Sequence, residues 1–193
     1  MMVAPPYSPQ NRTYTRDDLN ALYALPENKD KRFELVNGVL IEVPPPKHIH
    51  SWIASTLTEL LMLFIAQHRI GKVYTDTTGY NLPDGSVVMP DLSFVANERL
   101  IPPEIEMDFA PDLAIEVVSP SNLPTEMRDK VRSFLTSGTQ QVWVIYPNER
   151  EIDVATLQAD GSIAYKTYRM SDTLTGGDVL PGFAVAVAEI FPK

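Results

Sequence analysis

The stretch from residue 111 to residue 146 constrains the fold most tightly. It begins with the apolar run PDLAIEVVSPS, continues with helical periodicity over residues 125–137 up to Gly138, and closes with the apolar run QVWVIY. A strand, a helix and a second strand in this order predict a parallel pair of strands with the helix packed against their sheet. The stretch therefore predicts an α/β fold.

Hairpin signals surround this unit. In RFELVNGVLIEV, the dipeptide Asn37-Gly38 joins two alternating apolar runs, which is a strong hairpin signal. A turn at residues 83–85 joins KVYTDTTGYNL to SVVMPDLSFV, and two further strand-like runs flank residues 160–161. Hairpins combined with the strand-helix-strand unit predict a mixed β-sheet flanked by helices, with a hairpin near the N-terminus.

Two helices are expected before residue 71. The longer one covers residues 50–68, where apolar side chains recur at helical spacing, and Gly71 is its expected terminator. The shorter one begins at Thr15, because Thr15 and Asp18 form a pattern like a capping box. Residues 1–14 are polar and contain proline, and we expect them to be flexible.

Composition limits the class of protein. A chain of 193 residues, 44% of them hydrophobic, suffices for one domain with a substantial core, so we expect a single domain over residues 1–193. The chain has no cysteine, which excludes disulfides and zinc-thiolate sites. We see neither a signal-peptide pattern nor an apolar run as long as a membrane span, and we expect a cytoplasmic protein without a membrane partner.

Two acidic residues stand inside apolar, strand-like runs: Asp91 in VVMPDLSFV and Glu116 in LAIEVVSP. A buried carboxylate carries a steep desolvation cost unless a cation or hydrogen bonds compensate. They are 25 positions apart, which allows neighbouring strands, so both acids can converge at one end of the sheet. Paired carboxylates suit magnesium or manganese. Alternatively, each acid caps a loop or accepts backbone hydrogen bonds.

Lys130 lies on the expected helix of residues 125–137. Met127, Val131 and Phe134 form the apolar stripe of this helix, and Lys130 lies at the margin of that stripe. Its side chain can therefore reach towards the sheet. A lysine beside a metal-bound acid pair could orient or deprotonate an attacking water, or stabilise charge on a phosphate. Without the acids, it would be an ordinary solvated helix residue.

The charge balance argues against a simple nucleic-acid interface. The net charge is −9 and the isoelectric point is near 4.8, whereas contacts with phosphates depend on clustered lysine and arginine. DNA would have to bind a local basic patch. The candidates are Lys29, Lys31, Arg32 and Lys47 near the first hairpin, with Arg128 and Arg132 on the later helix.

The ordered series of motifs resembles the Uma-type family of restriction-endonuclease-like proteins, within the PD-(D/E)XK nuclease superfamily. The series is RFELVNG, His50 at the head of the long helix, MPDLSFV, PDLAIEVVSPS, the helix with Lys130, GTQQVWVIYP and LPGFAVAVAEIF. It runs from about Arg32 to Phe191. The resemblance implies a restriction-endonuclease-like α/β fold. It also implies an enzyme that hydrolyses DNA with magnesium or manganese.

The resemblance also assigns site residues. Asp91 takes the place of the aspartate in the PD element, and Glu116 takes the acidic place in the second element. Val118 stands where the superfamily usually has its lysine, and Lys130 on the following helix corresponds to the lysine of this family. Glu34 matches the acid of the opening hairpin and joins the expected site, unless it faces solvent.

Three further positions carry less weight. Phe134 stands where similar sequences often have tyrosine, so any role of that hydroxyl is absent. Asp112 also follows a proline but begins its strand, and we rank it behind Asp91. His50 matches a family position, yet a histidine at a helix start is more often a cap or a surface group than a catalyst.

Two functions are consistent with these residues. The first is a metal-dependent, endonuclease-like phosphodiesterase that hydrolyses DNA, with Asp91 and Glu116 as metal ligands and with Lys130 and Glu34 as further catalytic residues. A homodimer would let such an enzyme cut both strands. The alternative is a catalytically inactive nuclease-fold module for binding or assembly, which the acidity and the displaced lysine would favour.

Overall fold

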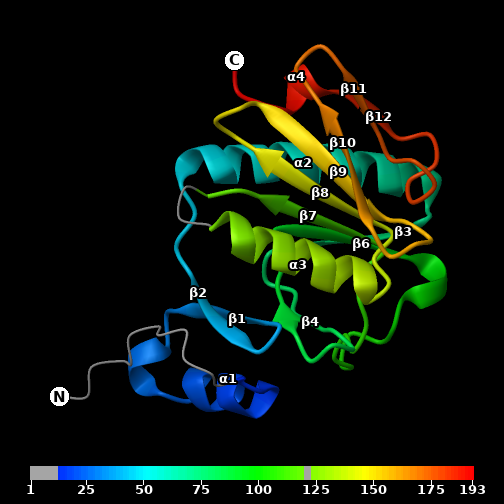
Figure 1. Ribbon diagram of the computed structural model, residues 1–193. Coiled ribbons are helices and arrows are strands. Elements are labelled where there is room, and N and C mark those ends of the chain that lie inside the picture. The colour runs from blue at the N-terminus through cyan, green and yellow to red at the C-terminus, as the bar shows by residue number, and fades with distance from the viewer. Residues whose placement is uncertain (1–12, 120–122) are drawn as a thin grey trace.

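The centre of the protein is a six-stranded mixed sheet, seen in a computed structural model that describes residues 13–119 and 123–193 (Figure 1). The strands β7 (Leu113–Val117) and β8 (Gln141–Tyr146) are parallel and are joined by α3 (Pro124–Thr136), while the other neighbouring strands are antiparallel. The expected strand-helix-strand unit is thereby confirmed. In spatial order the strands are β10 (Ile163–Tyr168), β9 (Glu151–Leu157), β8 (Gln141–Tyr146), β7 (Leu113–Val117), β6 (Leu92–Ala96) and β3 (Gly71–Thr75).

Helices α2 (His48–His68) and α3 cover opposite faces of this sheet (Figure 1). Side chains alternate along a strand, so Ile115 of β7 lies in the core beneath α2 while Ala114 lies in the core beneath α3. The two cores hold the sheet between them. Helix α2 buries Ile53, Leu57, Leu61 and Ile65, and α3 buries Val131, Phe134 and Leu135.

Helix α2 is long and apolar on average, although its uninterrupted apolar runs are short. It has 21 residues and a window of mean hydropathy 1.5, so by length and composition it could cross a membrane, and 22% of that window is buried. The expectation considered only uninterrupted apolar runs, whereas the length and mean hydropathy of this helix reach the range of a span. A count of uninterrupted apolar residues missed this property, because the scattered serines, threonines and histidines lower the mean hydropathy only slightly.

The end of α2 also differs from the expectation. Arg69, with φ of 55°, adopts the left-handed conformation and caps the helix, whereas Gly71 already belongs to β3. Gly71 is required there for another reason. A Cβ at this position would lie 2.2 Å from the backbone oxygen of Val95 on the neighbouring strand. The glycine therefore permits close approach of β3 and β6 rather than ending the helix.

The N-terminal part of the described chain is packed on the first hairpin. Helix α1 (Arg16–Tyr23) begins with the expected capping box of Thr15 and Asp18, which is confirmed. The backbone nitrogen of Tyr14 donates to the oxygen of Gly38 at 2.8 Å, so Tyr14 is tied to the hairpin turn. The rest of the expected flexible segment, residues 1–12, lies outside the described residues, as does most of the expected turn after Val118.

A second sheet contains the first hairpin. Strands β1 (Arg32–Val36) and β2 (Val39–Val43) pair across Asn37 and Gly38, whose φ angles of 48° and 76° are those of a tight hairpin turn, so this prediction is confirmed. Two short strands, β4 (Tyr80–Asn81) and β5 (Val87–Val88), complete this sheet in the order β2-β1-β5-β4. A short 3₁₀ helix, η1 (Pro26–Asn28), precedes β1.

The second expected hairpin is divided between the two sheets. Its outer parts, β3 and β6, pair in the central sheet, while β4 and β5 pair around residues 83–85 in the second sheet. The expectation of two continuous strands was therefore wrong. Pro90 lacks the N–H that a continuous ladder needs, and it separates β5 from β6. The break places Asp91 at the junction of the two sheets.

The C-terminal part closes the core under α2. Strands β9 and β10 form the expected hairpin around Gly161, which has φ of 81°. A small two-stranded sheet of β11 (Thr173–Thr175) and β12 (Ala184–Ala186) and the short helix α4 (Val187–Ile190) follow. Leu174, Val185 and Ile190 of these elements join the same apolar cluster as α2. The remaining short element is η2 (Asn97–Arg99) after β6.

Candidate active site

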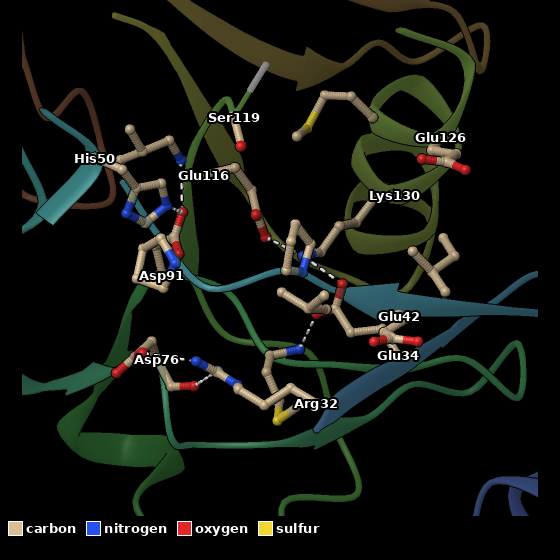
Figure 2. Close-up of a pocket in the computed structure, with 17 residues that line it drawn as sticks. Arg32, Glu34, Glu42, His50, Asp76, Asp91, Glu116, Ser119, Glu126 and Lys130 are labelled. Atoms are coloured by element: carbon tan, nitrogen blue, oxygen red, sulfur yellow. Dashed lines mark hydrogen bonds and ion pairs between the residues drawn. The ribbon is translucent and has the colours of Figure 1, made fainter. Parts of the chain in front are cut away.

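A pocket lies where the two sheets and the helices α2 and α3 meet (Figure 2). Segments far apart in the sequence line it: β1, β2, the first turn of α2, the break between β5 and β6, the end of β7, and α3. Its charged or titratable lining residues are Arg32, Glu34, Glu42, His50, Asp76, Asp91, Glu116, Glu126 and Lys130. All four expected site residues therefore come together in one pocket.

Lys130 forms the centre of the buried part of this pocket. Its Nζ lies 2.8 Å from Oε2 of Glu34 and 2.8 Å from Oε1 of Glu116, so one ammonium group bridges two carboxylates (Figure 2). All three residues are buried. Burial lowers the pKa of Lys130, but the ion pairs with Glu116 and Glu34 outweigh burial and raise it above its usual value. Lys130 is therefore held in its charged form.

Glu116 is the less completely satisfied of these two carboxylates. Its Oε1 is within ion-pair distance of Lys130 but has no hydrogen-bond partner in the described chain, so the contact lacks hydrogen-bond geometry. Burial raises the pKa of Glu116 to about 8, and the negative charges of Asp91 and Glu34 add to that rise against the opposing effect of Lys130. Glu116 therefore lies in an excess of negative charge in spite of its contact with Lys130.

Asp91 lies directly before β6, beside the end of β7. Because Leu92 pairs with Ile115, the strand register brings Asp91 to the same end of the sheet as Glu116. The Oδ2 atom of Asp91 accepts a hydrogen bond from the backbone nitrogen of Val117 at 2.7 Å. Within the described residues, its other oxygen, Oδ1, has no hydrogen bond and remains available for a ligand.

His50 is a member of this site, which corrects its expected role as a cap or surface group. It is inside the first turn of α2, whose N-cap is Lys47, and its side chain is 15% exposed. Its Nε2 lies 3.0 Å from Oδ2 of Asp91. The contact joins residues 41 positions apart, so only the packing of α2 against the break before β6 could reveal it.

Glu34 is buried rather than facing solvent. Its Oε1 accepts a hydrogen bond from the backbone nitrogen of Met89 at 2.6 Å, and its Oε2 pairs with Lys130. Both oxygens are therefore engaged. Glu34 fixes Lys130 and at the same time holds the backbone just before Pro90 and Asp91, so its position is that of a supporting residue for the site.

Asp112 belongs to a separate network. Its side chain accepts hydrogen bonds from the backbone nitrogen of Ala96 at 2.8 Å, from Arg99 at 2.7 Å and from Gln140 at 3.1 Å. These contacts fasten the start of β7 to its surroundings. They account for Asp112 as a structural residue and agree with its rank behind Asp91.

Phe134 and Val118, two further positions that the sequence analysis singled out, have structural roles. Phe134 is fully buried in the core beneath α3, where a tyrosine hydroxyl would need a partner. The backbone nitrogen of Val118 donates to Ile145 at 2.9 Å, which extends the pairing of β7 and β8. Lys130, one element later, contacts Glu116 in place of a lysine at position 118.

Sequence reasoning missed the acids at the mouth of the pocket. Asp76 pairs with Arg32, and Glu42 and Glu126 also line the pocket. Arg32, a member of the expected basic patch for DNA, also lines the pocket. Asp76 stands 44 residues from Arg32, in the break between β3 and β4, and no local pattern marks it.

The residues present suit a hard divalent cation. Across residues 13–119 and 123–193, no three histidine, aspartate or glutamate side chains form a ready-made metal cluster. Magnesium and manganese, however, often bind through one or two carboxylates together with water and substrate phosphates. Glu116, whose Oε1 is in contact with Lys130 alone among the described residues, and Asp91, whose Oδ1 has no hydrogen bond with them, fit that mode.

Comparisons with known proteins agree with this fold. A solved structure from Anabaena variabilis, described as a "putative nuclease belonging to DUF820", matches with a TM-score of 0.78 and 22% sequence identity, over 92% of this chain and 97% of that chain. At this identity the likeness shows a shared fold, a mixed α/β arrangement of sheets flanked by helices. A comparison with curated proteins finds no significant match. The sequence profile of the Uma2 family, described as "Putative restriction endonuclease", matches residues 17–188, and the chain therefore belongs to this family.

Proposed function

We propose that this protein is a metal-dependent phosphodiesterase that hydrolyses DNA. The observation that carries the proposal is the buried Lys130, which bridges Glu34 and Glu116 in the same pocket as Asp91. Buried charges carry a desolvation cost, so a gain in stability alone does not explain this cluster. Carboxylates with perturbed pKa values in a pocket are typical of functional sites. Membership of a family described as restriction endonucleases supports the same reaction class.

Each side chain has a distinct task in this proposal. Asp91 and Glu116 would hold magnesium or manganese, and the bound cation would supply Lewis-acid stabilisation of the phosphate and would activate a water. Lys130 keeps its proton, because its pKa is raised, so it orients the attacking water or stabilises charge on the phosphate rather than acting as a base. Glu34 holds Lys130, and His50 orients Asp91.

The route of DNA to the pocket must avoid the acidic surface. Lys31 pairs with Glu42 at 3.5 Å, and Arg32 pairs with Asp76 at 2.8 Å, so these two cations are partly neutralised. The other members of the expected basic patch make no ion pair with described residues and are exposed: Lys29, Lys47, Arg128 and Arg132. These four residues, none of which lines the pocket, are the proposed contacts with the DNA backbone outside it.

Incubation of supercoiled plasmid with the protein tests this function. We expect nicked or linear product with magnesium or manganese and none with EDTA. Asp91→Asn should abolish the product, while Glu126→Gln, which changes another acid of the pocket lining, should retain it. Wild-type protein that binds DNA and metal yet never cleaves would support the alternative of an inactive binding or assembly module.

A further inference from the structure

Arg32 of β1 is held in a fixed orientation at the pocket. Its Nη1 lies 2.8 Å from Oδ2 of Asp76, and its Nη2 donates to the backbone oxygen of the same residue (Figure 2). The side chain of Arg32 is 37% exposed and that of Asp76 is 46% exposed. A single residue thus orients the guanidinium while leaving part of it open to solvent.

Arg32 and Lys130, the two permanent cations among the described lining residues, differ in their exposure and in their free hydrogen-bond donors. Lys130 has an 11% exposed side chain with a carboxylate on either side. A guanidinium has five N–H donors in a planar fork, and Asp76 engages only part of that fork. Arg32 is therefore the cation that an incoming anion can contact directly.

The pocket needs such a cation if it takes a phosphodiester. Its described lining has six carboxyl groups against Arg32 and Lys130, so an incoming phosphate meets net repulsion in the absence of other cations. A planar guanidinium can bind two phosphate oxygens at once and is weakly hydrated, which makes it better suited than lysine to this task.

We propose that Arg32 binds a phosphate of the DNA backbone in this pocket and that Asp76 is the residue that positions its guanidinium. The proposal rests on the proposed function and assigns a substrate contact to a residue outside the expected catalytic set. The competing explanation is that the Arg32–Asp76 pair only fastens β1 to the segment after β3. That explanation predicts a loss of stability without a selective loss of DNA binding.

The test measures binding of a short labelled DNA duplex with hydrolysis-resistant phosphorothioate linkages, by fluorescence anisotropy in magnesium. Arg32→Gln should weaken binding about 10- to 100-fold, the usual effect of losing a charge-assisted hydrogen bond. Arg32→Lys should recover part of the loss, and Asp76→Asn should give a smaller loss. Arg16→Gln is the matched control, since Arg16 is 42% exposed and pairs with Glu106 away from the pocket.

Binding by Arg32→Gln within about twofold of Arg16→Gln would overturn the assignment, as would a wild-type protein that does not bind the duplex. Thermal melts of each variant separate unfolding from lost contact, and if Arg32→Gln does not fold, the Arg32→Lys and Asp76→Asn variants decide. Failure of the nuclease proposal looks different: wild-type protein then neither binds magnesium nor cuts plasmid, whatever Arg32 contributes to DNA affinity.

Discussion

Glu116 stands in an excess of negative charge. Lys130 divides one positive charge between Glu34 and Glu116, and Asp91 adds a further negative charge nearby. Together with burial, this raises the pKa of Glu116 to about 8, so the metal-free site takes up a proton around neutral pH. A divalent cation would replace that proton, and this makes metal affinity rise with pH.

The raised pKa of Glu116 predicts a pH dependence of stability in EDTA. The folded protein binds the proton of Glu116 more tightly than the unfolded chain does. The resulting contribution to stability is complete below the pKa of Glu116 in the unfolded chain, about 4.5, and is lost as the pH rises through its pKa in the folded protein, about 8. Glu116→Gln should therefore flatten the fall in melting temperature between pH 5.5 and pH 8. At pH 8 the variant should be at least as stable as wild type, because a neutral amide relieves the repulsion from Asp91 and Glu34.

Thermal melts of wild type, Glu116→Gln and the control Glu126→Gln at both pH values check this expectation. If Glu116 is instead a structural partner of Lys130, the variant should lose roughly 1–3 kcal/mol, the usual cost of breaking a buried polar contact. A pH profile that Glu116→Gln leaves unchanged would also contradict the assigned origin of the pKa shift.

At the scale of single residues, sequence reasoning found those whose local setting is unusual. Glu116 stood out because an acid interrupts an apolar strand, and Lys130 because it borders the apolar stripe of its helix. His50 and Asp76 carry no such mark. Their contacts with Asp91 and Arg32 span 41 and 44 residues of chain, so they follow from tertiary packing alone.

At the scale of elements, the same contrast separates the two N-terminal hairpins. The turn at Asn37 and Gly38 is a local property of two residues, and the hairpin and the position of its turn could be predicted. The break at Pro90 could not, because one proline at a strand end is also compatible with an edge strand. The break depends on tertiary pairing, because β3 and β6 pair in the central sheet while β4 and β5 pair in the second sheet. This division places Asp91 at the junction of the two sheets.

Helix α3 presents two different sides, which predicts a separable contribution to DNA binding. Lys130 faces the pocket, whereas Arg128 and Arg132 are exposed and free of ion pairs with described residues. Changing both arginines to glutamine should weaken DNA binding and lower the slope of log Kd against log salt by about 2, the value for two lost phosphate contacts. Anisotropy titrations at several salt concentrations measure this slope.

The control for this pair is Arg169→Gln, which removes an exposed arginine that pairs with Glu151 at 2.9 Å on the hairpin of β9 and β10. It should leave the slope unchanged. Equal slopes for the double variant, the control and wild type would show that DNA does not follow the outer side of α3.

At the scale of the whole molecule, the net charge of −9 sets the conditions for DNA binding. The overall field repels a polyanion, and the acidic pocket adds to that repulsion. Binding should therefore depend on a divalent cation as well as on the local arginines and lysines. The acidity that argued against a nucleic-acid partner is consistent with a site that first takes up metal.

A whole-molecule prediction concerns assembly. One pocket can cut one strand at a time, so cleavage of both strands is most simply achieved by two copies related by a two-fold axis. We expect a homodimer in light scattering coupled to size-exclusion chromatography. A monomer that persists at high protein concentration and in the presence of DNA would contradict this expectation.

The central claim is that Asp91 and Glu116 form a divalent-cation site, and calorimetric titration of manganese into the metal-free protein tests it most directly. We predict saturable binding in wild type, loss of that binding in Glu116→Gln, and wild-type binding in Glu126→Gln, whose carboxylate lines the same pocket. Saturable binding that Glu116→Gln retains unchanged, or no saturable binding in wild type, would contradict the account.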